Sequence, residues 1–217
     1  MIRFVDLSKS YQSPAGRKLV LDGSHAAFES GRNYAIMGPN GAGKSTVMRL
    51  ISGAELPSSG LVERSEVTSW PLGFHGGFNS TMTGRENVTF VARIYGQDPR
   101  PVLASAEDFA EIGSAIDMPV GSYSSGMKQR LAFGLSLSIR FDSYLIDETI
   151  SVGDARFRRK CEKALADRML TTRVIMISHS EKMVRKYCDA GMLLWQGQLH
   201  EYDDMDALIA DYRRLCS

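Results

Sequence analysis

The run from Gly38 to Ser45 has the composition and spacing of a loop that binds phosphate groups. It reads Gly-Pro-Asn-Gly-Ala-Gly-Lys-Ser and fits the pattern GxxxxGK[ST]. Glycines lack a Cβ, so backbone N–H groups can converge on phosphate oxygens, and a helix that follows directs its positive end at them. The pattern favours a nucleoside triphosphate site over a glycine turn without a ligand. Lys44 is expected on the β- and γ-phosphates and the Ser45 hydroxyl on Mg²⁺.

Three further residues with acid–base chemistry end short apolar runs. Asp147 follows Ser-Tyr-Leu-Ile, where phosphate-loop enzymes keep a carboxylate that supports Mg²⁺. Glu148 beside it could orient and deprotonate a water that attacks the γ-phosphate, although an Asp-Glu pair can equally be solvated charge. His179 ends another apolar run. At the carboxyl edge of a parallel sheet it could contact the γ-phosphate, whereas a lone histidine is more often structural.

The elements that must position these residues alternate between strand and helix. Apolar runs predict strands over 33–37, 143–146 and 174–177, and residues 44–52 predict a helix that ends at Gly53. A β-hairpin is expected over 192–202 and a last helix over 203–215. Strands that alternate with helices favour an α/β fold with a mainly parallel sheet.

The stretch 83–139 is different, because its pattern is helical throughout. Helices are expected over 85–95, 104–116 and 126–139. We therefore expect a single domain in which residues 1–82 and 140–217 form the α/β core and residues 83–139 form an inserted helical subdomain.

Composition narrows the function classes. The chain has 217 residues, of which 43% are hydrophobic and 24% charged, as in ordinary globular proteins. A formal charge of +1 gives no electrostatic case for nucleic acid as a partner. Cys161, Cys188 and Cys216 form no CxxC pair, which favours reduced thiols. Neither a signal peptide nor a membrane span is evident, so work at a membrane would require recruitment by a partner.

Residues 123–130, Tyr-Ser-Ser-Gly-Met-Lys-Gln-Arg, resemble the signature motif of ATP-binding cassette (ABC) ATPases. The common form begins LSGGQ, so Tyr123, Ser125 and Met127 are departures. The phosphate loop, the signature, the Asp-Glu strand and the strand-end histidine occur in the family's order over nearly the whole chain. This resemblance implies the P-loop NTPase fold of an ABC nucleotide-binding domain, in which a mainly parallel core sheet carries an antiparallel β part and an inserted helical subdomain.

A narrower resemblance is to bacterial polysaccharide exporters. The segments 83–87, 123–127 and 147–157 are similar to exporters of capsule, O-antigen or teichoic acid, and Ser-Trp-Pro at 69–71 is similar to capsular polysaccharide export subunits. This implies a peripheral ATPase on the cytoplasmic face of the inner membrane, working with a polytopic permease that handles the polysaccharide. Alternatives are an O-antigen or teichoic acid exporter, a soluble ABC ATPase of DNA repair or translation, and a small-molecule kinase.

The resemblance also assigns roles to residues. In the family, two cassettes form a head-to-tail homodimer that encloses two ATPs with Mg²⁺. The phosphates of one ATP would be held by Gly38, Pro39, Asn40, Gly41, Ala42, Gly43, Lys44, Ser45 and Thr46. The γ-phosphate would be covered by the partner's Ser124, the partner's Ser125 and the partner's Gly126. Asp147 would support Mg²⁺ together with Ser45, Glu148 would be the general base, and His179 would sense the γ-phosphate.

Two positions remain open within this resemblance. Tyr11 stands where the family has an aromatic residue that stacks on adenine, and the alternative is an ordinary core or surface tyrosine. The glutamine that usually links Mg²⁺ to the membrane subunit is not evident, and Asn79 or His75 lies in that region.

Overall fold

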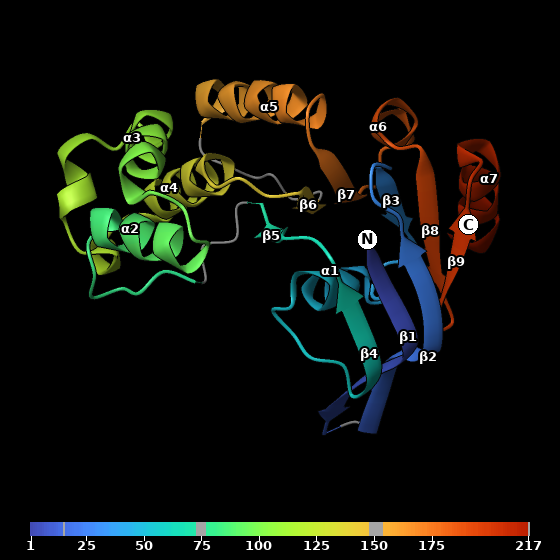
Figure 1. Ribbon diagram of the computed structural model, residues 1–217. Helices are drawn as coiled ribbons and strands as arrows, with labels where there is room; N and C mark the ends of the chain where they lie inside the picture. Colours follow the sequence, from blue (N-terminus) through green and yellow to red (C-terminus); the bar gives the residue numbers. More distant parts are fainter. Residues whose placement is uncertain (15, 73–76, 148–153, 217) are drawn as a thin grey trace. The chain divides into compact units, whose positions relative to one another are not determined.

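The computed structural model describes residues 1–14, 16–72, 77–147 and 154–216 (Figure 1). These residues fall into two compact units. Unit 1 comprises the described residues of Met1–Pro71, Asp142–Glu148 and Thr171–Ser217. Unit 2 comprises those of Leu72–Phe141 and Thr149–Leu170. Among the helices of the described residues, none combines the length and apolar character needed to span a bilayer.

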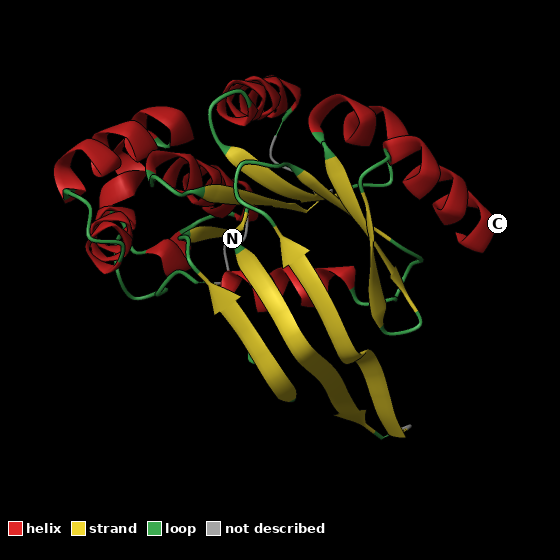
Figure 2. Cartoon of the chain, turned by 45° about the vertical axis from the view of Figure 1, so that its right-hand side comes forward, coloured by secondary structure: helices red, strands yellow, loops and turns green. Residues whose placement is uncertain are grey.

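The larger sheet of unit 1 has six strands in the order β5-β6-β7-β3-β8-β9. Figure 2 shows the strands of the chain in yellow. The six strands of this sheet are β5 (Thr68–Pro71), β6 (Ser143–Asp147), β7 (Arg173–Ile177), β3 (Tyr34–Met37), β8 (Ala190–Trp195) and β9 (Gln198–Tyr202). The first five run parallel, and β9 returns antiparallel to β8. Every residue of β3 and β7 is buried, which explains why both strands are hydrophobic apart from Arg173. The mainly parallel sheet and the hairpin expected from the sequence are confirmed.

The smaller sheet of unit 1 is antiparallel, with the order β2-β1-β4. Its strands are β1 (Ile2–Ser13), β2 (Gly16–Phe28) and β4 (Ser59–Arg64), which lie side by side in Figure 1. The register of β1 against β2 shifts three times between Phe4 and Ser10, and Asp6 has φ 48°. These irregularities interrupt the two-residue alternation by which a strand is recognised from sequence.

Helix α1 (Lys44–Ser52) joins the two sheets into one apolar core. It ends at Gly53, whose φ of 77° is the left-handed conformation of a C-cap, as the sequence predicts. Four of its side chains are fully buried: Val47, Met48, Leu50 and Ile51. They share one cluster with Phe4 and Phe28 of the smaller sheet and with Ile36 and Ile175 of the larger one. Each such side chain stabilises the fold by about 1.5–3 kcal/mol, so α1 is firmly anchored.

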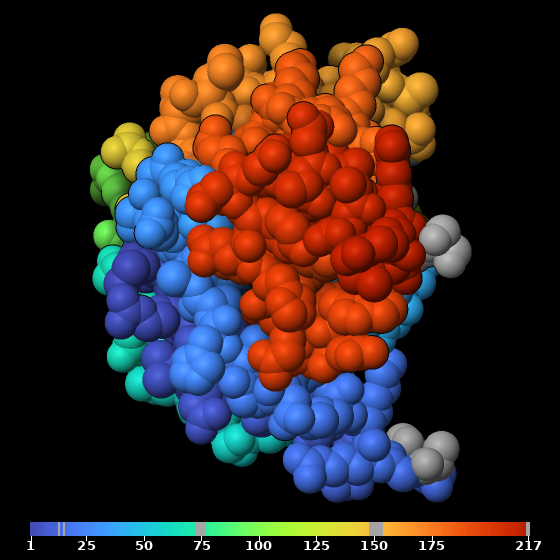
Figure 3. Space-filling view, turned by 90° about the vertical axis from the view of Figure 1, so that its right-hand side faces the viewer, coloured from blue at the N-terminus to red at the C-terminus, as the bar shows by residue number. Residues whose placement is uncertain are grey.

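Two further helices of unit 1 follow β7 and β9. Helix α6 (Glu181–Tyr187) begins after β7, and α7 (Met205–Cys216) follows β9. Residues 203 and 204, expected within the last helix, precede α7, and the Asp204 carboxylate accepts the N–H of Asp206. In the view of Figure 3, the C-terminal segment covers the middle of this face of unit 1, in red.

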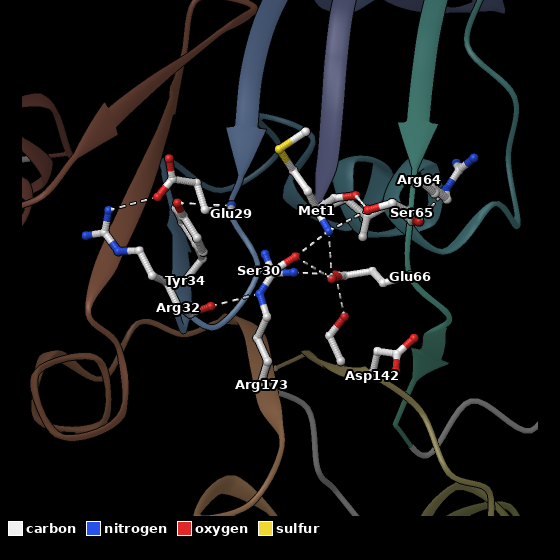
Figure 4. A network of polar contacts seen from close by, with 12 residues as sticks. Met1, Glu29, Ser30, Arg32, Tyr34, Arg64, Ser65, Glu66, Asp142 and Arg173 are labelled. Atoms are coloured by element: carbon white, nitrogen blue, oxygen red, sulfur yellow. Dashed lines mark hydrogen bonds and ion pairs between the residues drawn. The ribbon is translucent and has the colours of Figure 1, made fainter.

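A buried ionic network ties the smaller sheet to the start of β7 (Figure 4). Glu66, eight per cent exposed at its side chain, pairs with the Arg173 guanidinium. It also accepts hydrogen bonds from the Met1 ammonium at 2.9 Å and the Ser143 hydroxyl at 2.8 Å. Burial alone would raise the pKa of Glu66, but these hydrogen bonds and the charge of Arg173 outweigh it and lower that pKa. The network lies at the start of β7, the opposite end of the strand from His179.

Unit 2 is helical in its described residues. It contains α2 (Gly84–Ile94), α3 (Pro99–Ala110), the short 3₁₀ turns η1 (Gly113–Asp117) and η2 (Val120–Ser122), α4 (Ser125–Ser138) and α5 (Ala155–Met169). The helix predicted over 104–116 is wrong at both ends. Asp98 caps α3 and Pro99 opens it, because proline is tolerated in a first turn. Glu111 then takes a left-handed φ of 51° and ends the helix.

The division into units differs from the expected one. Unit 2 starts at Leu72 rather than at residue 83, and α5 belongs to it rather than to the core. The buried Phe157 of α5 packs edge-on against Phe109 of α3, with ring centroids 5.7 Å apart. Lys160 of α5 forms an ion pair of 2.7 Å with Glu111. These contacts attach α5 to the helices of residues 83–139.

Candidate functional site: a nucleotide site at the carboxyl edge of the sheet

The phosphate loop connects β3 to α1, as the sequence predicts. Gly38, Gly41 and Gly43 have φ of 152°, 77° and 111°, which residues with a Cβ rarely adopt. A Cβ on Gly38 would lie 2.6 Å from the Leu194 carbonyl oxygen of β8, and one on Gly43 would overlap Val20 of β2. The glycines therefore permit both the turn and its close packing on the two sheets.

Lys44 is the first residue of α1, and its side chain folds back over the loop. Its Nζ donates to the carbonyl oxygens of Gly38 at 2.7 Å and Pro39 at 3.0 Å. Gly43 at the N-cap offers no side chain to the first turn, and that turn contains no acidic residue. The N–H groups at the start of α1 and the Lys44 ammonium thus form a site suited to an anion.

Asp147 and Ser45 meet beside this loop. Asp147 ends β6, two strands away from β3, and its Oδ2 accepts a hydrogen bond from the Ser45 hydroxyl at 3.3 Å. Mg²⁺ prefers oxygen ligands and usually keeps several waters, so one hydroxyl and one carboxylate beside substrate phosphates are a suitable donor set. No cluster of three or more His, Cys, Asp or Glu side chains that could hold a metal by themselves occurs among the described residues. The residues present therefore fit a magnesium ion that completes its shell with phosphate and water.

His179 follows β7, the strand between β6 and β3. Its Nδ1 lies 2.8 Å from the hydroxyl of Tyr212 on α7. Since parallel strands end at one edge of the sheet, the sequence order alone predicts His179 near Asp147 and the phosphate loop. Tyr212 carries no such signal, because its pairing depends on how α7 packs.

Tyr11 lies on β1 next to the last residue of the phosphate-binding stretch. Its hydroxyl is 3.2 Å from Thr46 Oγ1 and donates to Glu55 Oε2 at 2.7 Å. Arg49 and Lys9 also bind Glu55, each at 2.8 Å. Burial opposes ionisation of Glu55, but the hydrogen bonds from Arg49, Lys9 and Tyr11 prevail and lower its pKa to about 2. The network fixes the Tyr11 ring beside α1, and the role of that ring toward adenine remains a prediction.

The signature segment begins α4 in unit 2. The exposed Ser124 is the N-cap, and its Oγ accepts the N–H of Met127 at 3.2 Å. Ser125 is the first helical residue, one earlier than predicted, and Gly126 follows it. Tyr123 is buried, and its hydroxyl donates to the Ala115 carbonyl oxygen at 2.5 Å. The structure thus accommodates tyrosine at the first signature position by giving its hydroxyl a backbone partner.

Three of the predicted positions are not placed at the nucleotide site. Glu148 and His75 lie outside the described residues. Asn79 is described, and its Oδ1 accepts both the N–H and the hydroxyl of Thr81, at 3.0 and 2.8 Å. Its side chain therefore stabilises the turn before α2.

Residues 21–151 match the family model described as ABC transporter. The chain belongs to the ABC transporter family. It is 46% identical over 206 residues to the ATP-binding protein BexA of Haemophilus influenzae, covering 95% of each chain. It is 44% identical over 215 residues to the capsule polysaccharide export ATP-binding protein CtrD of Neisseria meningitidis, covering 99% of this chain and 100% of CtrD.

The fold agrees with that family. The ATP-binding cassette MJ0796, solved as a dimer bound to ADP and Pi, superposes with a TM-score of 0.72 at 19% identity. The superposition covers 94% of this chain and 98% of MJ0796. The fold class expected from the sequence is confirmed. The chain is an ABC ATPase, and this family binds ATP, usually with Mg²⁺.

Proposed function

We propose that this chain is the ATP-binding and ATP-hydrolysing subunit of a bacterial ABC exporter that moves capsular polysaccharide across the inner membrane. The observation that carries the proposal is the full-length similarity to a capsule polysaccharide export ATP-binding protein. The phosphate loop, with Lys44 on its carbonyls and Ser45 hydrogen-bonded to Asp147, supports ATP binding at this site.

Each site residue has its own role in ATP hydrolysis. The loop N–H groups and Lys44 bind the phosphates and balance their charge, and Ser45 with Asp147 would hold Mg²⁺. When bound, Mg²⁺ neutralises charge on the β- and γ-oxygens. Glu148, which follows Asp147 in sequence, accepts a proton from the water whose oxygen attacks the γ-phosphorus, while the bond from that phosphorus to the ADP oxygen breaks. His179 contacts the γ-phosphate, and Tyr11 stacks on adenine.

The same proposal includes two kinds of partner. Two copies form a head-to-tail dimer, and the partner's Ser124, the partner's Ser125 and the partner's Gly126 cover the γ-phosphate bound by the first copy. The first N–H groups of α4 at this serine-glycine pair are suited to an anion. Because ATP then contacts both copies only in the closed dimer, it shifts the population toward closure. A polytopic permease, against which the dimer lies at the cytoplasmic face, turns that closure into movement of the polysaccharide.

Deletion of the gene, followed by location of the capsule polymer in the cell, tests this function. We expect the polymer to accumulate in the cytoplasm and to return to the surface when the wild-type chain is restored. Unchanged surface capsule would contradict the proposal. Loss of O-antigen or teichoic acid from the surface, with capsule intact, would assign the chain to one of the related exporters instead.

A further inference from the structure

We infer that Tyr212 of α7 is a positioning residue for His179, and that the last helix of the chain thereby sets the histidine that faces the γ-phosphate. The inference rests on the proposed role of His179. Its direct observation is the 2.8 Å distance between His179 Nδ1 and the Tyr212 hydroxyl. The two rings are 6.3 Å apart between centroids and tilted by 42°, so they meet through this polar contact rather than by stacking.

Helix α7 is fixed to the sheet, so Tyr212 has a defined place. Leu208 and Ile209 of α7 are buried. Gly191 of β8 has no Cβ, and a Cβ there would overlap Leu208, so the helix packs as closely as the strand allows. The Tyr202 hydroxyl of β9 donates to Asp211 of α7 at 2.8 Å. Figure 1 shows α7 beside β8 and β9 accordingly.

Helix α7 is also tied to α6, which begins two residues after His179. Arg213 donates from Nε and Nη2 to the two carboxylate oxygens of Glu181, at 2.7 and 2.6 Å. Arg185 of α6 pairs with Asp206 of α7. The hydrogen bond from Arg213 lowers the pKa of Glu181. The contacts hold Tyr212 in place relative to the turn that contains His179.

The chemistry of the ring explains why this partner matters. A neutral imidazole has one N–H donor and one acceptor nitrogen. Phosphate oxygens only accept, so the ring nitrogen that faces them must carry the proton. A tyrosine hydroxyl that donates to Nδ1 keeps the proton on Nε2 and also restricts rotation of the ring. In the proposed arrangement the Tyr212 hydroxyl is the donor, because a phosphate oxygen at Nε2 requires the proton there, and Tyr212 then fixes the direction in which His179 donates.

The chain offers a matched control for a merely structural role. Tyr212→Phe removes the hydroxyl that reaches His179 and keeps the ring. Tyr202→Phe removes a hydroxyl that also secures α7, but through Asp211. If Tyr212 acted only by holding α7, the two variants would behave alike.

The test compares steady-state ATP hydrolysis by the full chain with its membrane subunit, for the wild type, both tyrosine variants and His179→Ala. We expect Tyr212→Phe to lower kcat about 3- to 10-fold, the range of one lost hydrogen bond, with KM for ATP little changed. Tyr202→Phe should stay near wild type, and His179→Ala should lose more than Tyr212→Phe. The ¹⁵N spectrum of the ring nitrogens supplies an independent readout, because His179→Ala identifies the signal among the four histidines.

In that spectrum we expect wild-type His179 to carry its proton on Nε2, and Tyr212→Phe to shift its ring signals while Tyr202→Phe does not. Equal kcat for the two tyrosine variants, or unchanged ring signals in Tyr212→Phe, would overturn the inference. If His179→Ala is impaired and Tyr212→Phe is not, only the inference fails. If His179→Ala hydrolyses ATP normally, the proposed role of His179 fails and the inference falls with it.

Discussion

At the scale of single residues, Gly41 and Gly43 separate two reasons for glycine in the phosphate loop. Both have a positive φ, which costs a residue with a Cβ about 1–2 kcal/mol. A Cβ on Gly41 meets nothing within 4 Å, whereas one on Gly43 overlaps the buried Val20. Gly43→Ala should therefore lower the free energy of unfolding by about 1–3 kcal/mol more than Gly41→Ala does, which is the usual effect of overpacking. Urea unfolding of both variants measures this, and equal losses would contradict the packing argument.

Glu148 can be separated from nucleotide binding by a substitution that keeps its shape. Glu148→Gln removes the proton acceptor and a negative charge beside the polyphosphate. We predict that the variant binds ATP, loses turnover and accumulates as an ATP-bound dimer. The measurement is turnover together with particle size in solution, with and without ATP, in the presence of the membrane subunit. Turnover near wild type would refute the general-base role, and loss of ATP binding would point to a structural or metal-holding role.

What the sequence predicts at this scale depends on how local the signal is. The phosphate loop is contiguous, Asp147 ends an apolar strand and His179 follows one closely, so their neighbourhood follows from residue type and order. The contacts of His179 with Tyr212 and of Tyr11 with Glu55 join residues 33 and 44 positions apart. Neither pair has a spacing that marks it, so only the packing of α7 and β1 reveals them.

At the scale of elements, Glu55 links β1 to α1. Its folded pKa of about 2 lies below the ordinary 4.5, so its ionised form stabilises the fold at pH 7. That contribution is complete above about pH 4.5 and is lost as pH falls toward 2. Glu55→Gln should lower the free energy of unfolding at pH 7 by roughly 1–3 kcal/mol, and the deficit should shrink between pH 4.5 and 3.

Urea unfolding at several pH values checks this, with Glu63→Gln on β4 as the control. Glu63 is half exposed and lies 3.8 Å from Arg3, so its loss should cost no more than about 1 kcal/mol. A deficit for Glu55→Gln that is equal to the control, or constant with pH, would show that the network does not stabilise these elements.

The elements themselves were predictable where one pattern dominates. Helix α1 has helical spacing and a glycine C-cap, and its bounds agree with the prediction. The helix expected over 104–116 begins at Pro99 in the structure, because the first turn of a helix tolerates proline. Strand β1 was obscured because its bulges disturb the alternation of buried and exposed residues.

At the scale of the whole molecule, the proposed dimer places each phosphate loop opposite the signature serine of the other copy. A mixture of Ser124→Arg and Lys44→Ala chains then forms dimers in which one composite site carries both lesions and the other carries neither. We predict partial ATP hydrolysis from such mixed dimers, isolated through two different tags. Hydrolysis no greater than that of either variant alone would leave the composite site unsupported and contradict the prediction.

We predict that ATP bound at this phosphate loop drives export of the capsule polymer. The direct measurement is surface capsule in a deletion strain that carries Lys44→Ala, compared with wild type and with Lys18→Ala, an exposed lysine of β2. Lys44→Ala removes the charge that faces the phosphates, while the buried core of α1 remains. We predict that the wild type, Lys18→Ala and Lys44→Ala are present in the cells in equal amounts. The wild type and Lys18→Ala should restore surface capsule, whereas Lys44→Ala should leave the polymer in the cytoplasm. Full surface capsule with Lys44→Ala would contradict the account.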